Sequence, residues 1–271
     1  MTLSPTARWM LRLAMAVGLA VIYVPLLIVL INSFNIDRTF AWPPPGWTTQ
    51  WWGRAWDSTG ARQALWTSVR AGLGATAVAL VLGTMVAFAV QRYSFFGRNS
   101  VSLLVVLPIA LPGIITGIAL DAAFRSVVEP VGIGKGLLSV VIGHATFCVV
   151  VVFNNVLARL RRLGGNLEEA SADLGADTFQ TFRYVTFPLL RSALFAGGLL
   201  AFALSFDEIV VTTFTAGPGV QTLPIWIFSN LFRPNQAPVI NVVAAVLIVL
   251  SVVPIYLAQR ISADAAGGGR V

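Results

Sequence analysis

Six long apolar segments divide this chain of 271 residues, and each is long enough to cross a lipid bilayer. The hydrocarbon core is spanned by about 20 residues of helix, at about 1.5 Å of rise per residue. Since the bilayer interior offers no hydrogen-bond partners to a backbone, helices are the structure expected for such segments. The sequence therefore predicts an all-α, polytopic membrane protein with six transmembrane helices, at residues 13–31, 65–90, 101–120, 138–158, 192–212 and 239–259.

The composition excludes several other classes of protein. Only 11% of the residues are charged, which is too little to cover the surface of a soluble domain of this length, so membrane lipid is an expected partner. The net charge is +7, but the basic residues lie between the apolar segments, so no nucleic-acid partner is expected. Cys148 is the single cysteine, which excludes a disulfide framework and a cysteine metal cluster.

Basic residues predict the orientation of the chain in the membrane. Their strongest cluster, Arg159, Arg161 and Arg162, follows the fourth apolar segment. Loops rich in arginine and lysine stay on the cytoplasmic side, so both termini are expected to be cytoplasmic. This topology gives a single transmembrane domain at 13–259, cytoplasmic tails at 1–12 and 260–271, a long outer loop at 32–64 and a cytoplasmic loop at 159–191.

Two features of the apolar segments and their loops predict local structure. Prolines in the first, third and sixth segments each remove a backbone donor and are expected to bend or interrupt a helix, at Pro25, Pro108, Pro112 and Pro254. In the outer loop, the tryptophans at 51, 52 and 56 are placed to share one face of a short helix. Such a helix suits either an anchor at the lipid headgroups or a docking contact for an external partner.

The cytoplasmic loop carries the most ordered local pattern, between residues 166 and 188. Asn166 can cap a helix that has Glu169 at its third position, and Gly175 can end this helix in a left-handed turn. Asp177 or Thr178 can start a second short helix that runs toward Pro188. From the pattern alone, the two helices either dock a soluble partner or pack beneath the membrane bundle.

The same loop resembles the signature of binding-protein-dependent ABC importer permeases. That signature reads Glu-Ala-Ala, three residues, Gly, nine residues, Ile, one residue and Leu-Pro; the matching positions here are Glu169, Ala170, Ser171, Gly175, Val185, Phe187 and Pro188. Strings similar to Leu107-Pro-Ile-Ala-Leu-Pro-Gly113 and Leu204-Ser-Phe-Asp-Glu-Ile-Val-Val211 occur in permeases of the spermidine/putrescine type. The resemblance covers nearly the whole chain and is weakest at the termini.

This resemblance implies one half of a type I importer in a bacterial inner membrane. Its expected partners are a dimer of cytoplasmic ATP-binding subunits, a second permease that is a paralogue of this chain, and an extracytoplasmic solute-binding protein. The substrate implied is a polyamine such as spermidine or putrescine, with 4-aminobutyrate or another small solute as the alternative. The resemblance assigns ATPase coupling to a set of loop residues: Glu168, Glu169, Ala170, Ser171, Leu174, Gly175 and Pro188.

No catalytic or cofactor site of the chain's own is expected. The nearest string to an ATP-binding loop, at 132–136, has glycine after Lys135 where serine or threonine is needed, so a partner subunit must hydrolyse the ATP. His144 is the single histidine and is expected to pack in the bundle or to bridge helices, with Asn154 and Asn155 as candidate partners and contact with substrate as the alternative.

Asp207 and Glu208 lie inside the fifth apolar segment, where an ionised carboxylate in hydrocarbon costs at least about 2.5 kcal/mol. They are expected either to line the path of a cationic substrate, or to form an internal ion pair or a hydrogen bond to a neighbouring helix. An ATP-independent, cation-coupled transporter is a further alternative that would use the same two carboxylates.

Overall fold

The computed structural model describes residues 4–38, 41–233 and 235–251, in which the regular structure is helical apart from one isolated bridge between Asn35 and Trp47. In these residues, four helical runs are long and apolar enough to cross a membrane: Pro5–Asn32, Thr59–Arg92, Leu137–Leu163 and Thr178–Phe206. A fifth span is formed if the helix pair Arg98–Ala110 and Gly113–Val131, bent by 106°, counts as one. The sixth predicted segment, 239–259, starts within an apolar helix at Ala237–Ser251, and its remainder lies outside the described residues, as does Pro254.

The chain divides into two compact units, which in the described residues are 4–62 with 227–251, and 63–226. The first unit contains α1 (Pro5–Asn32) and α2 (Gln50–Asp57). In α2, Trp51 is 1% exposed and its Nε1 donates to the Asn35 carbonyl at 2.8 Å, whereas Trp56 is 75% exposed. The predicted shared face is therefore wrong, because five residues of helix turn these two side chains to different sides.

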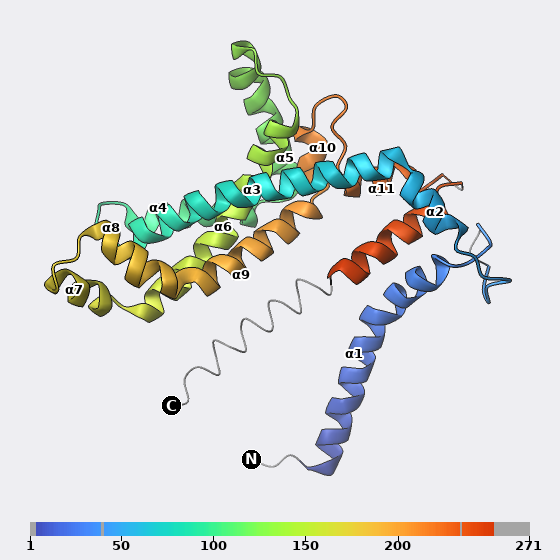
Figure 1. Cartoon of the computed structure of the whole chain (residues 1–271), viewed down its shortest axis with the longest axis horizontal. Helices are drawn as coiled ribbons and strands as arrows, with labels where there is room; N and C mark the ends of the chain where they lie inside the picture. The colour runs from blue at the N-terminus through green and yellow to red at the C-terminus, as the bar shows by residue number, and fades with distance from the viewer. Residues whose placement is uncertain (1–3, 39–40, 234, 252–271) are drawn as a thin grey trace. The chain divides into compact units, whose positions relative to one another are not determined.

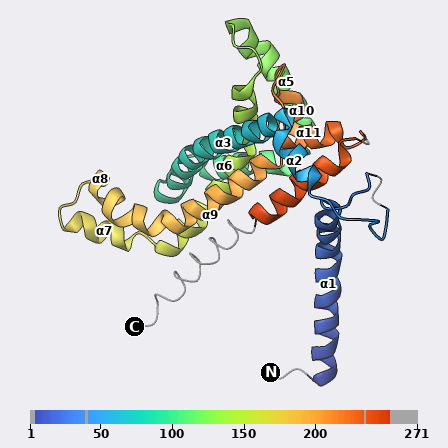
Figure 2. The ribbon, with the colours of Figure 1, turned by 45° about the vertical axis from the view of Figure 1, so that its right-hand side comes forward.

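Three long helices run side by side in the second unit: α3 (Thr59–Arg92), α6 (Leu137–Leu163) and α9 (Phe187–Phe206) (Figures 1 and 2). Their shared core contains Phe153, Val156, Leu160 and Leu190. On α3, a buried stripe of small residues recurs at every fourth position: Ala71, Ala75, Ala79, Gly83 and Ala87. A Cβ on Gly83 would lie 2.9 Å from the Val149 carbonyl oxygen, so α3 and α6 approach each other backbone to backbone. Small residues allow this approach where no hydrophobic effect drives helices together.

The third and fifth predicted spans are both broken. The third ends at Ala110 in α4 (Arg98–Ala110) and restarts in α5 (Gly113–Ala123). Pro112 forces the preceding residue into an extended conformation, with ψ of 143° at Leu111, which confirms the predicted interruption at this proline. The helices continue through Pro25 and Pro108. After α5 come a π-helical turn (Phe124–Val128) and a 3₁₀ turn (Glu129–Val131).

The prediction of an unbroken helix over 192–212 is wrong. Helix α9 ends at Phe206 and α10 (Val210–Thr215) restarts the chain after a gap of three residues. Polar residues in the gap supply the reason, since Glu208 caps the new helix instead of continuing the old one. A further short helix, α11 (Leu223–Asn230), follows α10.

At the opposite end of α9, the loop between α6 and α9 forms α7 (Asn166–Asp173) and α8 (Thr178–Thr181), which lie together at one end of the α6 and α9 pair (Figure 1). Gly165, not Asn166, stands at the N-cap of α7, so the predicted cap is wrong by one residue. The second short helix is also not separate. It passes through a π-helical turn, η3 (Phe182–Thr186), directly into α9, with Pro188 in the first turn of α9, where its missing N–H is tolerated.

Candidate functional site

The elbow between α7 and α8, residues 166–181, is held by its own hydrogen bonds. Gly175 has φ of +86°, a left-handed conformation that favours glycine, and the Ala176 N–H donates to the Ser171 carbonyl at 3.1 Å. Asp177 caps α8 by accepting from the Gln180 N–H at 2.8 Å, as the sequence predicts. The hydroxyls of Ser171 and Thr181 lie 3.1 Å apart and tie the two helices together.

The elbow presents apolar side chains outward. Leu174 is 90% exposed, and Leu167 and Phe179 are exposed as well. Glu169, Ala170 and Gly175 also lie on the exposed surface, whereas Ser171 is half-buried. An ordered, exposed and apolar corner of this kind suits a contact with another protein.

Glu168 differs from the other loop residues, because its carboxylate points back to the helix bundle. Arg92, the last residue of α3, places Nη2 3.0 Å from Oε1 and Nε 2.9 Å from Oε2 of Glu168. The Thr186 hydroxyl donates to Oε1 at 3.0 Å. The carboxylate therefore joins α7 to α3 and to the start of α9. Sequence reasoning assigned Glu168 to coupling but missed Arg92 and Thr186, which lie far from it in the chain.

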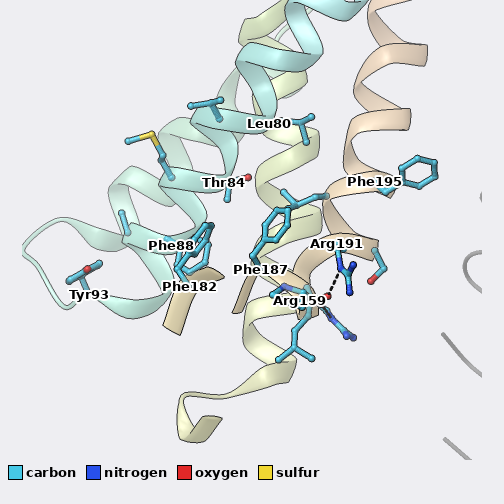
Figure 3. Close-up of a pocket in the computed structure, with 16 residues that line it drawn as sticks. Leu80, Thr84, Phe88, Tyr93, Arg159, Phe182, Phe187, Arg191 and Phe195 are labelled. Carbon is cyan, nitrogen blue, oxygen red and sulfur yellow. Dashed lines mark hydrogen bonds between the residues drawn. The ribbon is translucent and has the colours of Figure 1, made fainter. Parts of the chain in front are cut away.

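Beside this contact, a groove of about 1310 Å³ runs between α3 and α9 (Figure 3). Phe88, Phe182 and Phe187 form its aromatic floor, with ring centroids 5.8 Å apart for the first pair and 6.0 Å for the second. Arg159 and Arg191 lie at one end, where the Arg159 Nε donates to the Leu189 carbonyl at 2.9 Å. The aromatic contacts give η3 a second attachment to α3, and Pro188 also lines the groove.

Asp207 and Glu208 occupy the break between α9 and α10. Asp207 follows the last residue of α9 and is exposed, while Glu208 is half-buried. The Glu208 Oε1 accepts from the Val211 N–H at 2.8 Å, so this carboxylate caps the first turn of α10. Within the described ranges, neither carboxylate forms an ion pair.

His144 bridges helices, but its partners are not Asn154 or Asn155. The buried ring contacts Ser205 on α9 through Nδ1 at 2.7 Å and Thr212 on α10 through Nε2 at 2.8 Å. The predicted partners share α6 with His144 and lie too far along it, and the Asn155 amide bonds within its own helix. A sequence gives no local signal for contacts that are 61 and 68 residues away.

Comparison with known proteins gives consistent results. The family model described as "Binding-protein-dependent transport system inner membrane component" matches residues 79–265. The putrescine transport system permease protein PotI of Escherichia coli K12 is 34% identical over 85% of this chain and 83% of its own length. The spermidine/putrescine transport system permease protein PotC of Haemophilus influenzae is 34% identical over 94% of this chain and 98% of its own length.

A solved structure shares the fold. It is the crystal structure of a bacterial ABC transporter involved in the import of the acidic polysaccharide alginate, with a TM-score of 0.66, 15% identity, and coverage of 97% of this chain and 99% of that one. The signature in the loop between α6 and α9, the family match and the relatives agree, and the resemblance noted in the sequence is confirmed. This chain belongs to the binding-protein-dependent transport system inner membrane component family, as a multi-pass permease subunit of an ABC importer.

Proposed function

We propose that this permease subunit imports a polyamine of the putrescine or spermidine class by alternating access. The support is the identity to PotI and PotC, whose names carry these substrates, together with the two carboxylates at the break in the fifth span. Putrescine and spermidine carry ammonium groups at neutral pH, and carboxylates are their natural partners. The arrangement places acidic groups where α9 stops, inside an otherwise apolar run.

The transport unit has six spans in this chain, residues 13–259, with both termini in the cytoplasm. The apolar helix Ala237–Ser251 supplies the described part of the sixth span. A second permease, a paralogue of this chain, completes the pathway, because one set of six helices encloses only half of it. A solute-binding protein delivers the amine from outside.

The elbow of α7 and α8 docks into a dimer of ATP-binding subunits. Its exposed corner, with Leu174 at the tip and Glu169 and Ala170 beside it, forms the contact, and Gly175 sets the turn. Glu168 and Pro188 act on the other side of the elbow, where they connect it to α3 and α9. Ser171 holds the two short helices together. ATP is bound and hydrolysed by the partner, and this chain carries no cofactor.

Asp207 is the carboxylate placed to meet the amine. It is exposed on the surface of this chain, and a carboxylate at membrane depth needs water, a cation or a partner chain to offset its desolvation. Glu208 is half-buried and holds α10, so it contributes charge from a fixed position. This exposed carboxylate at the helix break is the observation on which the proposed substrate class depends.

The test is uptake of labelled putrescine by proteoliposomes that hold the whole complex, supplied with saturating loaded binding protein. We expect Asp207→Asn combined with Glu208→Gln to lower the maximal uptake rate at least tenfold, a change of about 1.4 kcal/mol in the transport barrier. Glutamine keeps an oxygen for the Val211 N–H, so α10 stays capped while the charge is removed.

Glu129→Gln is the matched control, since it removes an exposed carboxylate elsewhere on the same chain. Its uptake rate is expected to stay within twofold of the unmodified permease. Normal uptake by the double variant would refute the proposed path. Stimulation of ATP hydrolysis by 4-aminobutyrate, with no response to putrescine or spermidine, would replace the polyamine with that substrate.

A further inference from the structure

One face of α6 forms a series of polar contacts with the two helices on either side of the break. The Ser139 hydroxyl donates to the Thr215 carbonyl on α10 at 2.7 Å, and the Cys148 thiol donates to the Ala201 carbonyl on α9 at 3.3 Å. His144 stands between them and touches both helices, through Ser205 before the break and Thr212 after it.

The neighbouring residue brings α6 close enough for these contacts. A Cβ on Gly143 would lie 3.1 Å from Thr215 Cγ2 and 3.3 Å from Val211 Cγ1, which is closer than side chains normally approach. Helix α10 is therefore held against the backbone of α6 at the level of His144. The imidazole is completely buried there, and a buried polar ring is stable only when both nitrogens have partners.

The hydrogens of this network can be assigned by counting donors. The single hydroxyl hydrogen of Thr212 is given to the Glu208 carbonyl, 2.8 Å away. Toward His144 the Thr212 oxygen must then accept, so Nε2 carries the hydrogen. The Nδ1 atom of the neutral ring accepts from the Ser205 hydroxyl. The three hydrogen bonds therefore all donate in one direction, from Ser205 through His144 and Thr212 to the backbone carbonyl of Glu208.

This series of hydrogen bonds crosses the break that carries both acidic residues. Ser205 lies two residues before Asp207, and the last acceptor in the series of hydrogen bonds is the carbonyl of Glu208 itself. Backbone hydrogen bonds continue α9 as far as Asp207 and Glu208, at 3.2 and 3.5 Å, and the bridge from α6 adds a contact on each side of the break that helps to fix how α9 and α10 are arranged. The directions of the two carboxylates follow from that arrangement.

We infer that His144 is a positioning residue that holds the α9–α10 break through Ser205 and Thr212, and thereby aims Asp207 and Glu208 at the passing substrate. The inference rests on the proposed function, since it assigns a purpose to carboxylates that the proposed function places on the amine's path. His144 itself touches no substrate. It acts as neutral imidazole with hydrogen on Nε2.

The first test reads the network directly. The full-length permease, purified without a histidine tag after labelling with ¹⁵N-histidine, contains one labelled ring, because the chain has one histidine. Solid-state NMR in lipid is expected to show a neutral ring protonated at Nε2. In Thr212→Val the Nε2 resonance is expected to shift, and in Thr146→Val it is not, since the Thr146 hydroxyl bonds only within α6. A ring protonated at Nδ1, or a Thr212→Val spectrum unchanged from that of the parent, overturns the inference.

The second test measures uptake of putrescine and ATP hydrolysis in the reconstituted complex. His144→Leu is expected to lower maximal uptake at least tenfold and to raise the number of ATP molecules hydrolysed per putrescine imported. A merely structural loss of folded complex would lower uptake and hydrolysis together and leave their ratio unchanged. His144→Gln is expected to recover uptake to within threefold of the parent, because its amide can donate through the NH₂ group and accept through the carbonyl oxygen. An unchanged ratio, or equal loss in the leucine and glutamine variants, overturns the inference.

A double-mutant comparison separates this inference from the proposed function. If His144 acts through the carboxylates, His144→Leu causes no further loss of uptake in the Asp207→Asn, Glu208→Gln background. If it acts independently, the fold loss of uptake in the combined variant is the product of the two separate fold losses. If that background itself transports normally, the proposed substrate path fails, and the Nε2 resonance and the glutamine recovery decide the role of His144 at the break.

Discussion

The ion pair between Arg92 and Glu168 gives the sharpest energetic prediction. Its side chains are 17% and 25% exposed, so most of each charged group is out of water. The Arg92 Nη2 donates to Oε1 of Glu168 at 3.0 Å, and Nε lies 2.9 Å from Oε2 without forming a hydrogen bond, so the pair combines one charge-assisted hydrogen bond with a close contact of opposite charges. Exposed pairs contribute about 0.2–1 kcal/mol, while removing one partner of a fully buried pair costs about 3–5 kcal/mol. For a pair of this intermediate burial we expect each single substitution to cost about 2 kcal/mol.

This cost is expected to appear in the docking of the ATP-binding subunits. Without the pair, α7 loses its tie to α3, and the elbow must be ordered when the partner binds. A change of about 2 kcal/mol corresponds to roughly thirtyfold weaker binding. The assay titrates ATP-binding subunits onto the purified permease pair and follows ATP hydrolysis, for Arg92→Met, Glu168→Gln and the combination of both. Arg161→Met serves as the control, because Arg161 is an exposed arginine in the last turn of α6.

The double variant distinguishes a pair from two unrelated residues. If the two side chains act together, the double substitution weakens docking by much less than the product of the single effects, with a coupling energy of about 1–2 kcal/mol. If the free-energy cost of the double substitution equals the sum of the two single costs to within about 0.3 kcal/mol, the reasoning is refuted. Docking of the single variants that matches the parent at every ATP-binding subunit concentration would also refute it.

Two glycines give further predictions, each with a physical reason at one atom. Gly83→Ala is expected to destabilise the permease by about 1–3 kcal/mol in thermal unfolding, because the new Cβ meets the Val149 carbonyl oxygen at 2.9 Å. Gly18→Ala is the control and is not expected to lower the unfolding temperature, because its new Cβ meets nothing within 4 Å. Gly175→Ala is expected to cost about 1–2 kcal/mol through its φ of +86° and to weaken docking of the ATP-binding subunits, with Gly175→Asn closer to the parent. Unchanged unfolding of Gly83→Ala, or unchanged docking of Gly175→Ala, would contradict these reasons.

Hydropathy predicted the first, second and fourth spans because it measures what lipid solvates, which is a property of each segment alone. The helices are longer than the apolar segments: α1 begins at Pro5 instead of residue 13, and α6 ends at Leu163 instead of residue 158. Helices continue past the hydrocarbon as long as capping and polar side chains support them. The turn at Gly175 and the cap at Asp177 were likewise predictable, since both depend on residues within one turn.

Features that depend on a distant segment were not predicted. The break at Asp207 is stabilised by Glu208, which caps α10 from within the break, by Thr212 on α10 and by His144 on the distant helix α6. The partners of Glu168 and His144 were not predicted for the same reason. By contrast, the small-residue stripe on α3 was available in the sequence as a strict four-residue repeat, and a search for that repeat would have identified the face that packs on α6.

Helix α9 connects without interruption the elbow and the α9–α10 break, the two regions to which the proposed function assigns a role. At its first turn, η3 holds the ring of Phe182 against Phe88 and the Thr186 hydroxyl against Glu168, so movement of the elbow must displace this end. At its last turn, Ser205 is held by His144, two residues before the exposed carboxylate. A helix of 20 residues transmits displacement along its axis because its hydrogen bonds resist compression, but at the break α9 has no such bonds to α10. The motion produced by ATP-driven docking is therefore expected to concentrate at Asp207–Ile209, the three residues that carry both acidic groups.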